Sequence, residues 1–255
     1  MAITVEHIDG VRIVTINRPE RRNALDPDTM AEIGDTFTEA ETNDDVRVMV
    51  LTGAGDQAFC AGADLKAFAA AAPAVPGAPT RLGTEVFVER TYPKPIIAAV
   101  NGTAVGGGLG IALGCDIIVA ADHARFGTPE VQRGLVGAGV GSRMAKRLPL
   151  AIAMELILTG EPISATRAFE LGLINRVVPL ADLMPATMAM AARIAANGPM
   201  AVRVSKQIIH DVSGAISGID MPALRAQAAP VMSSADAKEG ARAFAEKRPP
   251  NFTGR

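Results

Sequence analysis

Two glycine-rich turns carry the residues of this sequence that could do chemistry. The first is "AFCAGADLKAF" (Ala58 to Phe68), and the second is "VNGTAVGGGLGIALGCD" (Val100 to Asp116). Each turn is expected to lead from a strand into a helix, where unpaired backbone N–H groups favour negative charge. The amides of Ala63 and Gly107 could together stabilise an oxyanion. By local pattern alone, the same stretches also fit two ordinary tight turns.

Other chemistries fit the sequence less well. A dinucleotide-binding G-x-G-x-x-G pattern counted from Gly106 places Ile111 where the third glycine is needed. The next expected strand follows Gly110 too closely for a crossover helix. The turn also has glycine where a nucleophilic serine would stand in G-x-S-x-G. His7, His123 and His210 lack paired ligand spacing, so no metal site is predicted.

The turns need strands and helices to position them. Val11–Asn17 and Val46–Thr52 alternate as half-buried strands do, and a helix between them is expected to start at Asp26 and Pro27. Apolar runs at 95–102 and 116–122 predict buried strands. Beyond Pro149 the chain is expected to be helical to about residue 247, with a brief strand in "INRVV". The Ala- and Pro-rich stretch 67–80 predicts a mobile surface loop.

Composition limits the classes of protein that remain. The chain has 255 residues, 49% hydrophobic content and a net charge of -2, as expected for a globular protein with a small-molecule partner and no nucleic acid. It lacks a run of about 18 apolar residues and an apolar leader, so we expect a soluble, cytoplasmic protein without a membrane partner. Cys60 and Cys115 are expected to be buried free thiols.

Three stretches together resemble the enoyl-CoA hydratase/isomerase (crotonase) family. They are "AFCAGADLKAF", "NGTAVGGGLGIALGCDIIVAAD" and "ARFGTPEVQRGLVGAGVG", in that order and spacing, and the likeness runs from "INRPERRNAL" to "KEGARAFAEKRPPNF". The resemblance implies an α/β fold, a crotonase-like ββα spiral over residues 1–195. It further implies a helical C-terminal trimerisation region over 196–255. The expected assembly is a homotrimer or a hexamer built as a dimer of trimers.

The resemblance also implies an acyl-CoA thioester substrate, with coenzyme A as part of the substrate and no separate cofactor. Carried over by position, Ala63 and Gly107 would hold the thioester oxygen and stabilise the enolate. Further acyl-CoA contacts are expected from Arg22, Ala24, Ala61, Asp64, Leu65, Lys66, Gly110 and Lys247. Asp64 is more simply explained as a helix cap than as a reacting group.

One departure from the family pattern bears on the reaction. Family hydratases use two glutamates. Glu130 in "FGTPEV" matches the later one, whereas Gly110 occupies the position of the first. One carboxylate can still move a proton from carbon 2 to carbon 4, which favours isomerisation of 3-enoyl-CoA to 2-enoyl-CoA. The alternatives are a hydratase whose second acid comes from elsewhere, or a non-catalytic acyl-CoA-binding relative. Glu85, Glu89 and Tyr92 are candidates for that second acid.

Overall fold

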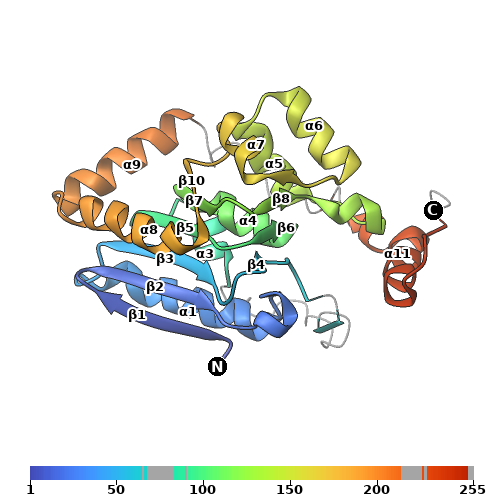
Figure 1. The fold of residues 1–255 in the computed structure, drawn as a ribbon, viewed down its shortest axis with the longest axis horizontal. Coiled ribbons are helices and arrows are strands. Elements are labelled where there is room, and N and C mark those ends of the chain that lie inside the picture. Colours follow the sequence, from blue (N-terminus) through green and yellow to red (C-terminus); the bar gives the residue numbers. More distant parts are fainter. Residues whose placement is uncertain (65, 68–82, 90, 214–225, 227–228, 252–255) are drawn as a thin grey trace.

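A sheet of six described strands forms the frame of the molecule (Figure 1). The structure is a computed structural model that describes residues 1–64, 66–67, 83–89, 91–213, 226 and 229–251. The strand order is β1-β2-β3-β5-β7-β10, and only the β1–β2 pair is antiparallel. The strands are β1 (Ile3–Ile8), β2 (Val11–Ile16), β3 (Val48–Gly53), β5 (Ile96–Val100), β7 (Ile117–Ala121) and β10 (Arg176–Val178).

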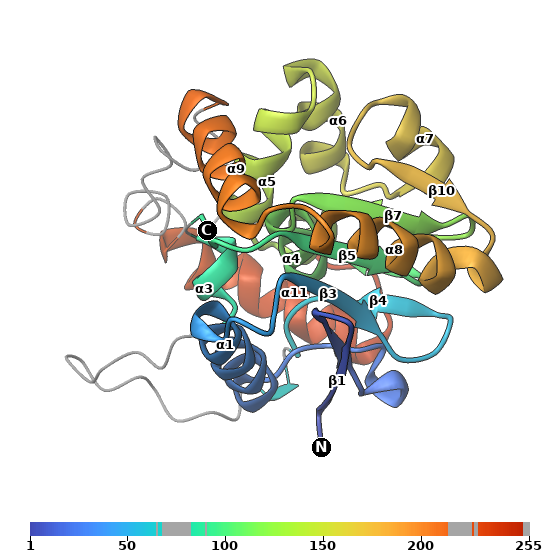
Figure 2. The same ribbon diagram turned by 90° about the vertical axis from the view of Figure 1, so that its left-hand side faces the viewer.

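Helices cover both faces of this sheet (Figure 2). Helix α1 (Pro27–Thr42) packs Ile33 and Phe37 onto one face, and α8 (Leu180–Ala195) packs Leu183 and Ala191 onto the other. Strand β3 is therefore buried at every residue, and the prediction that it is half-buried was wrong. Its second face is covered by a helix far away in sequence, which local alternation does not report.

A second, smaller sheet supplies the second strands of the ββα spiral that the resemblance implied, although the local pattern did not predict where these strands lie. Its order is β4-β6-β8-β9, and the β4–β6 and β6–β8 pairs are parallel. The strands are β4 (Ala58–Cys60), β6 (Thr103–Val105), β8 (Arg125–Gly127) and β9 (Ile163–Ser164). Each of β4, β6 and β8 follows a strand of the larger sheet, which produces a spiral of paired strands. These strands are too short for alternation to be recognised.

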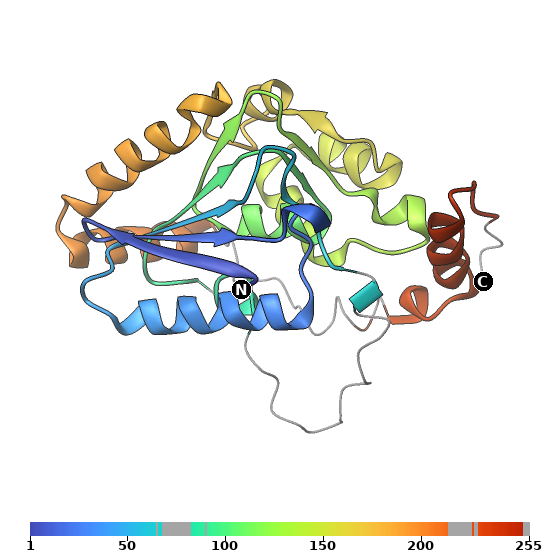
Figure 3. The ribbon, with the colours of Figure 1, turned by 60° about the horizontal axis from the view of Figure 1, so that its bottom comes forward.

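Helices dominate the rest of the described chain, as predicted. They are α3 (Glu85–Val88), α4 (Gly107–Gly114), α5 (Ala138–Arg147), α6 (Leu150–Thr159), α7 (Ala165–Glu170), α9 (Pro199–Ser213) and α11 (Ala235–Glu246). A short 3₁₀ helix, η2 (Pro129–Arg133), follows β8, and another, η1 (Pro19–Arg21), precedes α1. Helix α11 lies at one end of the molecule, away from the larger sheet (Figure 3).

Several local predictions are confirmed. The side chain of Asp26 accepts the N–H of Thr29 at 2.8 Å, with Pro27 as the first residue of α1. Cys60 and Cys115 are free and buried, and burial raises the pKa of the Cys60 thiol to about 12. The prediction for 67–80 lies outside the described residues, apart from Ala67. Among the described helices, none is both long and apolar enough to cross a bilayer.

Candidate active site

Three loops meet at one edge of the small sheet, and each carries part of the predicted site. The segment 61–64 follows β4, Gly106 and α4 follow β6, and η2 with Glu130 follows β8. Because β4, β6 and β8 are parallel neighbours, their carboxyl ends lie side by side. The small sheet therefore brings Ala63, Gly107 and Glu130 together from distant parts of the sequence.

The segment 61–64 is held by hydrogen bonds to the segment before α1. Ala61 N–H donates to the Arg22 carbonyl at 3.1 Å, and Leu25 N–H donates to the Gly62 carbonyl at 2.8 Å. Asp64 N–H donates to the Leu25 carbonyl, also at 2.8 Å. Within the part of the chain that the structure describes, the intervening N–H of Ala63 has no hydrogen-bond acceptor. This amide is available to a ligand.

Gly107 supplies the matching amide at the start of α4. Gly106 N–H donates to the Gly127 carbonyl at 3.0 Å, whereas Gly107 N–H has no acceptor among the described residues. Gly62 has a φ of +90°, and a Cβ there would lie 3.2 Å from the Gly107 nitrogen. The two turns are therefore in contact, and glycine suits position 62 both conformationally and sterically. This arrangement supports the predicted pair of donors.

Gly108 lies where the start of α4 packs against the end of β4. A Cβ at position 108 would lie 2.1 Å from the carbonyl oxygen of Cys60 and 2.7 Å from its carbonyl carbon. The missing side chain thus allows the first turn of α4 to pack on the end of β4. The absence of a Cβ at Gly108 therefore serves the packing of backbone against backbone, and not the approach of a ligand.

Glu130 lies beside this pair of amides. A Cβ at Gly106 would lie 3.4 Å from its Oε1, and a Cβ at Gly137 would lie 3.0 Å from the same oxygen. Its Oε2 is buried and has no hydrogen-bond partner in the described structure. Burial raises the pKa of Glu130, while its own backbone N–H and the positive charge of Arg133 oppose that rise. Glu130 is thus suited to hold and release a proton.

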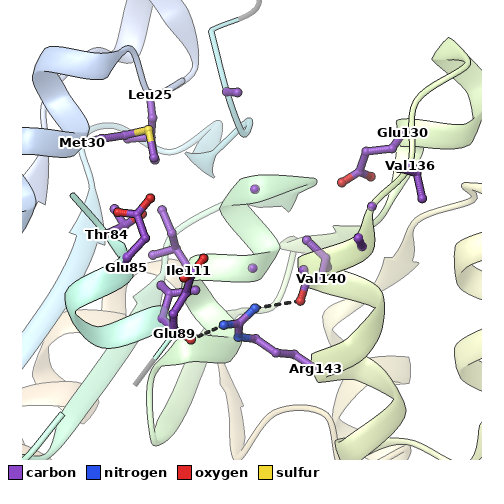
Figure 4. A pocket seen from close by; sticks show the side chains of 17 residues that line it. Leu25, Met30, Thr84, Glu85, Glu89, Ile111, Glu130, Val136, Val140 and Arg143 are labelled. Carbon is purple, nitrogen blue, oxygen red and sulfur yellow. Dashed lines mark hydrogen bonds between the residues drawn. The ribbon is translucent and has the colours of Figure 1, made fainter. Parts of the chain in front are cut away.

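A cavity of about 300 Å³ extends from the two amides along α4. Glu130 stands on one side of α4, and Glu85 of α3 and Glu89, which directly follows α3, stand on the other, near Ile111 (Figure 4). The described lining is otherwise mainly apolar and comprises Leu25, Met30, Ala63, Thr84, Val88, Gly107, Gly110, Val136, Gly137, Ala138, Gly139, Val140 and Arg143. The structure therefore brings more than one carboxylate to the predicted acyl-binding space.

Tyr92 is turned away from this cavity. Its side chain is buried against Phe37, and its hydroxyl donates to the Phe37 carbonyl at 2.7 Å. The suggestion that Tyr92 could be the second acid is therefore wrong. Glu85, the first residue of α3, and Glu89, the residue that directly follows α3, both line the cavity, whereas Tyr92 does not.

Arg143 was missed by the sequence analysis. Its buried guanidinium donates to the Gly139 carbonyl at 2.7 Å and to the Val88 carbonyl, which joins α5 to α3 at the cavity wall. Burial lowers the pKa of Arg143, and the nearby Glu89 carboxylate opposes this effect. No motif pointed to this arginine, although the glycines of "GLVGAGVG" indicated close packing around it.

The structure brings only some of the residues predicted to contact coenzyme A close to one another. The segment that contains Arg22 and Ala24 lies against segment 61–64. The Arg18 side chain, for which no role was predicted, links the two segments by donating to the Ala24 carbonyl and to Asp64 Oδ2. Asp64 Oδ1 accepts the Ala67 N–H at 3.3 Å, as a helix cap does, and this confirms its predicted role.

The structure does not test the predicted acyl-CoA contacts of Leu65, Lys66 and Lys247. Leu65 lies outside the described residues, and Lys66 is exposed. Lys247 is the C-cap of α11 with a φ of +54°, and among the described residues it has no backbone hydrogen bond to segments 22–25 or 61–64. Its assignment therefore stays a prediction.

Comparison with known proteins agrees with this geometry. The family model described as enoyl-CoA hydratase/isomerase matches residues 6–255, and the chain belongs to that family. Its curated relatives include the (E)-benzylidenesuccinyl-CoA hydratase of Thauera aromatica, 38% identical over 100% of both chains. Another is the short-chain-enoyl-CoA hydratase of Clostridium acetobutylicum, 39% identical over 96% of this chain and 95% of that protein.

Solved structures confirm the predicted crotonase-like fold. A carnitinyl-CoA hydratase from Mycobacterium avium matches with a TM-score of 0.89 and 40% identity over 100% of this chain and 99% of its own. An enoyl-CoA hydratase/isomerase from Pseudoalteromonas atlantica matches with a TM-score of 0.88 and 32% identity, over 99% and 100%. The chain is thus an acyl-CoA enzyme of this family. The names of its curated relatives favour hydration, and the expected preference for isomerisation is not supported.

The close approach of Gly108 to Cys60 generates a first prediction. Gly108→Ala should lower the free energy of unfolding by about 1–3 kcal/mol, the usual cost of overpacking, although alanine favours a helix. Gly110→Ala is the matched control, because a Cβ there meets only the side chain of Val140, at 3.2 Å. Urea unfolding measures both, and a Gly108→Ala protein as stable as wild type would contradict the packing argument.

The burial of Glu130 generates a second prediction. Because its pKa is raised on folding, the folded state binds the proton more tightly than the unfolded state, so wild-type stability should fall as pH rises above the ordinary glutamate range. Glu130→Gln should therefore unfold at higher urea than wild type at neutral pH. This advantage should shrink in acid, where the wild-type carboxyl is protonated in both states.

The control for that measurement is Glu161→Gln, which changes an exposed carboxylate. If Glu161→Gln gains as much stability to urea as Glu130→Gln, desolvation of Glu130 is not the cause of the added stability. The same conclusion holds if the added stability of Glu130→Gln does not vary with pH.

Proposed function

We propose that this protein catalyses the reversible addition of water to the carbon 2–carbon 3 double bond of a 2-enoyl-CoA, giving a 3-hydroxyacyl-CoA. The observation that carries the proposal is the cavity that Glu130 shares with Glu85 and Glu89. It answers the main objection to hydration, which was the missing glutamate at position 110. The hydratase names of the relatives support the same reaction.

The oxyanion amides fix the order of the substrate atoms along α4. With the thioester oxygen between the N–H groups of Ala63 and Gly107, carbon 2 comes next to Glu130, whose carboxyl lies against Gly106. Carbon 3 then lies toward Gly110, one helical turn further along α4. Loss of one such donor typically costs about 10²–10³ in rate, so this pair accounts for a large part of the catalysis.

Two proton transfers complete the addition. A carboxylate of α3, Glu85 or Glu89, takes a proton from water while the water oxygen bonds to carbon 3. The electrons of the double bond pass to the thioester as an enolate held by the two amides, and Glu130 then gives its proton to carbon 2. Its raised pKa favours the protonated form that this step requires. Exchange with solvent restores the starting protonation states of both carboxyl groups.

Isomerisation is the second candidate, and Gly110 favours it. Glu130 is the carboxylate beside the amides, and by itself it could remove a proton from carbon 2 and return it at carbon 4. The same enolate would form, so the oxyanion site does not distinguish the two reactions. They differ in their need for a second carboxylate and in the starting protonation state of Glu130.

A comparison of glutamate variants separates the candidates. Wild type should hydrate crotonyl-CoA faster than it isomerises a 3-enoyl-CoA. Both reactions are measured by the absorbance of the conjugated thioester, which hydration removes and isomerisation forms. Glu130→Gln should reduce turnover by about 10²-fold or more with KM changed only a few-fold. Glu85→Gln or Glu89→Gln should reduce hydration and leave any isomerisation intact, and Glu161→Gln serves as the exposed control.

Two outcomes would overturn the proposal. Fast isomerisation, with hydration unaffected by either α3 variant, would establish the one-carboxylate enzyme. Tight binding of acyl-CoA without turnover of either substrate would establish a non-catalytic relative.

The pH dependence of kcat/KM gives an independent prediction. Hydration requires protonated Glu130, so kcat/KM should fall as pH rises through the raised pKa of this carboxyl. Isomerisation requires ionised Glu130, so its kcat/KM should rise through the same range. This fall of kcat/KM with rising pH, the Glu130 limb of the pH profile, should be absent from the residual activity of Glu130→Gln. A hydration rate that rises through this range would contradict the assigned acid role.

A further inference from the structure

Helix α11 packs against η2, the short helix that carries Glu130, although the two are far apart in sequence (Figure 3). Gly240 and Phe244 are four residues apart on α11 and so lie on the same face. Both meet Arg133, the last residue of η2. The C-terminal helix thus has two points of contact with the element that holds the proposed acid.

The contact at Gly240 involves backbone on both sides. A Cβ at this position would lie 1.9 Å from the Arg133 carbonyl oxygen and 2.4 Å from its carbonyl carbon. Glycine is a weak helix former, and Gly240 lies within α11. Because no other residue allows this approach without a shift of backbone, the contact explains the glycine.

The contact at Phe244 involves side chains. The guanidinium carbon of Arg133 lies 4.7 Å from the centroid of the Phe244 ring, within the range of a cation–π interaction. Phe244 is 59% exposed with this contact in place, so the cation–π pair lies at the surface of the molecule. The charge that it holds in place is the one that lowers the pKa of Glu130 against the effect of burial.

A shift at Arg133 would be carried to Glu130 because η2 is tightly closed. Leu135 N–H donates to the Glu130 carbonyl at 3.0 Å, and Gly134 N–H donates to the Val131 carbonyl at 3.2 Å. These bonds make residues 130–135 a compact unit. The Glu130 carboxyl lies beside the backbone of Gly106 and Gly137, so a shift of η2 would change its position relative to both segments.

Helix α11 is itself fixed at both ends. The Ser234 side chain accepts the Ala237 N–H at 3.0 Å at its start. The buried Glu239 carboxylate accepts from Arg248 at 2.7 Å and from the Asn251 N–H at 3.0 Å, which folds the following segment back onto the helix. A helix fixed in this way can act as a support for η2.

We propose that α11 is a positioning element for catalysis, in which Gly240 and Phe244 hold Arg133 and thereby fix Glu130 beside the oxyanion amides. This role rests on the proton transfer assigned to Glu130 in the proposed function. It does not depend on which of the two reactions is catalysed, because both use the same carboxyl group.

Gly240→Ala tests the proposal, and the reverse substitution at the neighbouring position, Ala241→Gly, is the control. The added methyl group must displace η2, and a displacement of the order of 1 Å can cost up to about 10²-fold in rate. We expect kcat to fall about 10-fold or more, with KM for the acyl-CoA little changed and the Glu130 limb of the pH profile moved. Ala241→Gly, at an exposed neighbouring position, should weaken α11 and leave both kcat and the limb unchanged.

Each variant is assayed with whichever substrate wild type turns over, so an error in the assigned reaction does not affect the test. The positioning role would be overturned if Gly240→Ala had the same kcat and the same Glu130 limb as wild type. It would also be overturned if Ala241→Gly lost as much kcat as Gly240→Ala. If Gly240→Ala does not fold, Phe244→Leu decides the question. Release of Arg133 from the ring should move the limb to higher pH, and an unmoved limb would overturn the proposal.

Discussion

The contact between the Cys60 carbonyl and the backbone of Gly108 is the constraint on which the active site depends. A Cβ at position 108 would lie 2.1 Å from that oxygen, so the end of β4 and the start of α4 approach as closely as bare backbone allows. The approach places the turn containing Ala63 against the turn containing Gly107, and the two free amides face the same space. In the proposed mechanism, oxyanion stabilisation would therefore come from backbone geometry that is set before the substrate binds.

The carboxylates, by contrast, are positioned by elements that pack from outside this backbone frame. Glu130 comes from η2, Glu85 comes from α3, and Glu89 is the residue that directly follows α3. Burial of Glu130 with an unpartnered oxygen carries a desolvation cost that a purely structural residue would not need. Such a cost is expected at a functional site, where a raised pKa is useful, and the surrounding fold has to supply the compensating stability.

The sequence was informative where function depends on local pattern. Ala63, Gly107 and Glu130 were identified from three motifs, and the structure places them together. The burial of β3 on both faces was missed because the covering helix α8 is distant in sequence. Arg143 was missed because its hydrogen bond to the Val88 carbonyl joins α5 to α3, two helices that no motif connects. The small sheet was missed because its strands have two or three residues each.

Gly110 shows why a missing residue in a motif has to be judged by its surroundings. A Cβ at this position would lie 3.2 Å from Val140 Cγ2, so the bare backbone of α4 is fitted to a side chain of α5. The space near position 110 that a longer side chain would need is partly taken by Val140, while α3 presents two glutamates to the same cavity. The glycine at 110 and the packing of Val140 therefore belong to one arrangement, and in the proposed hydration the second proton-transferring group is Glu85 or Glu89 in place of a residue at 110.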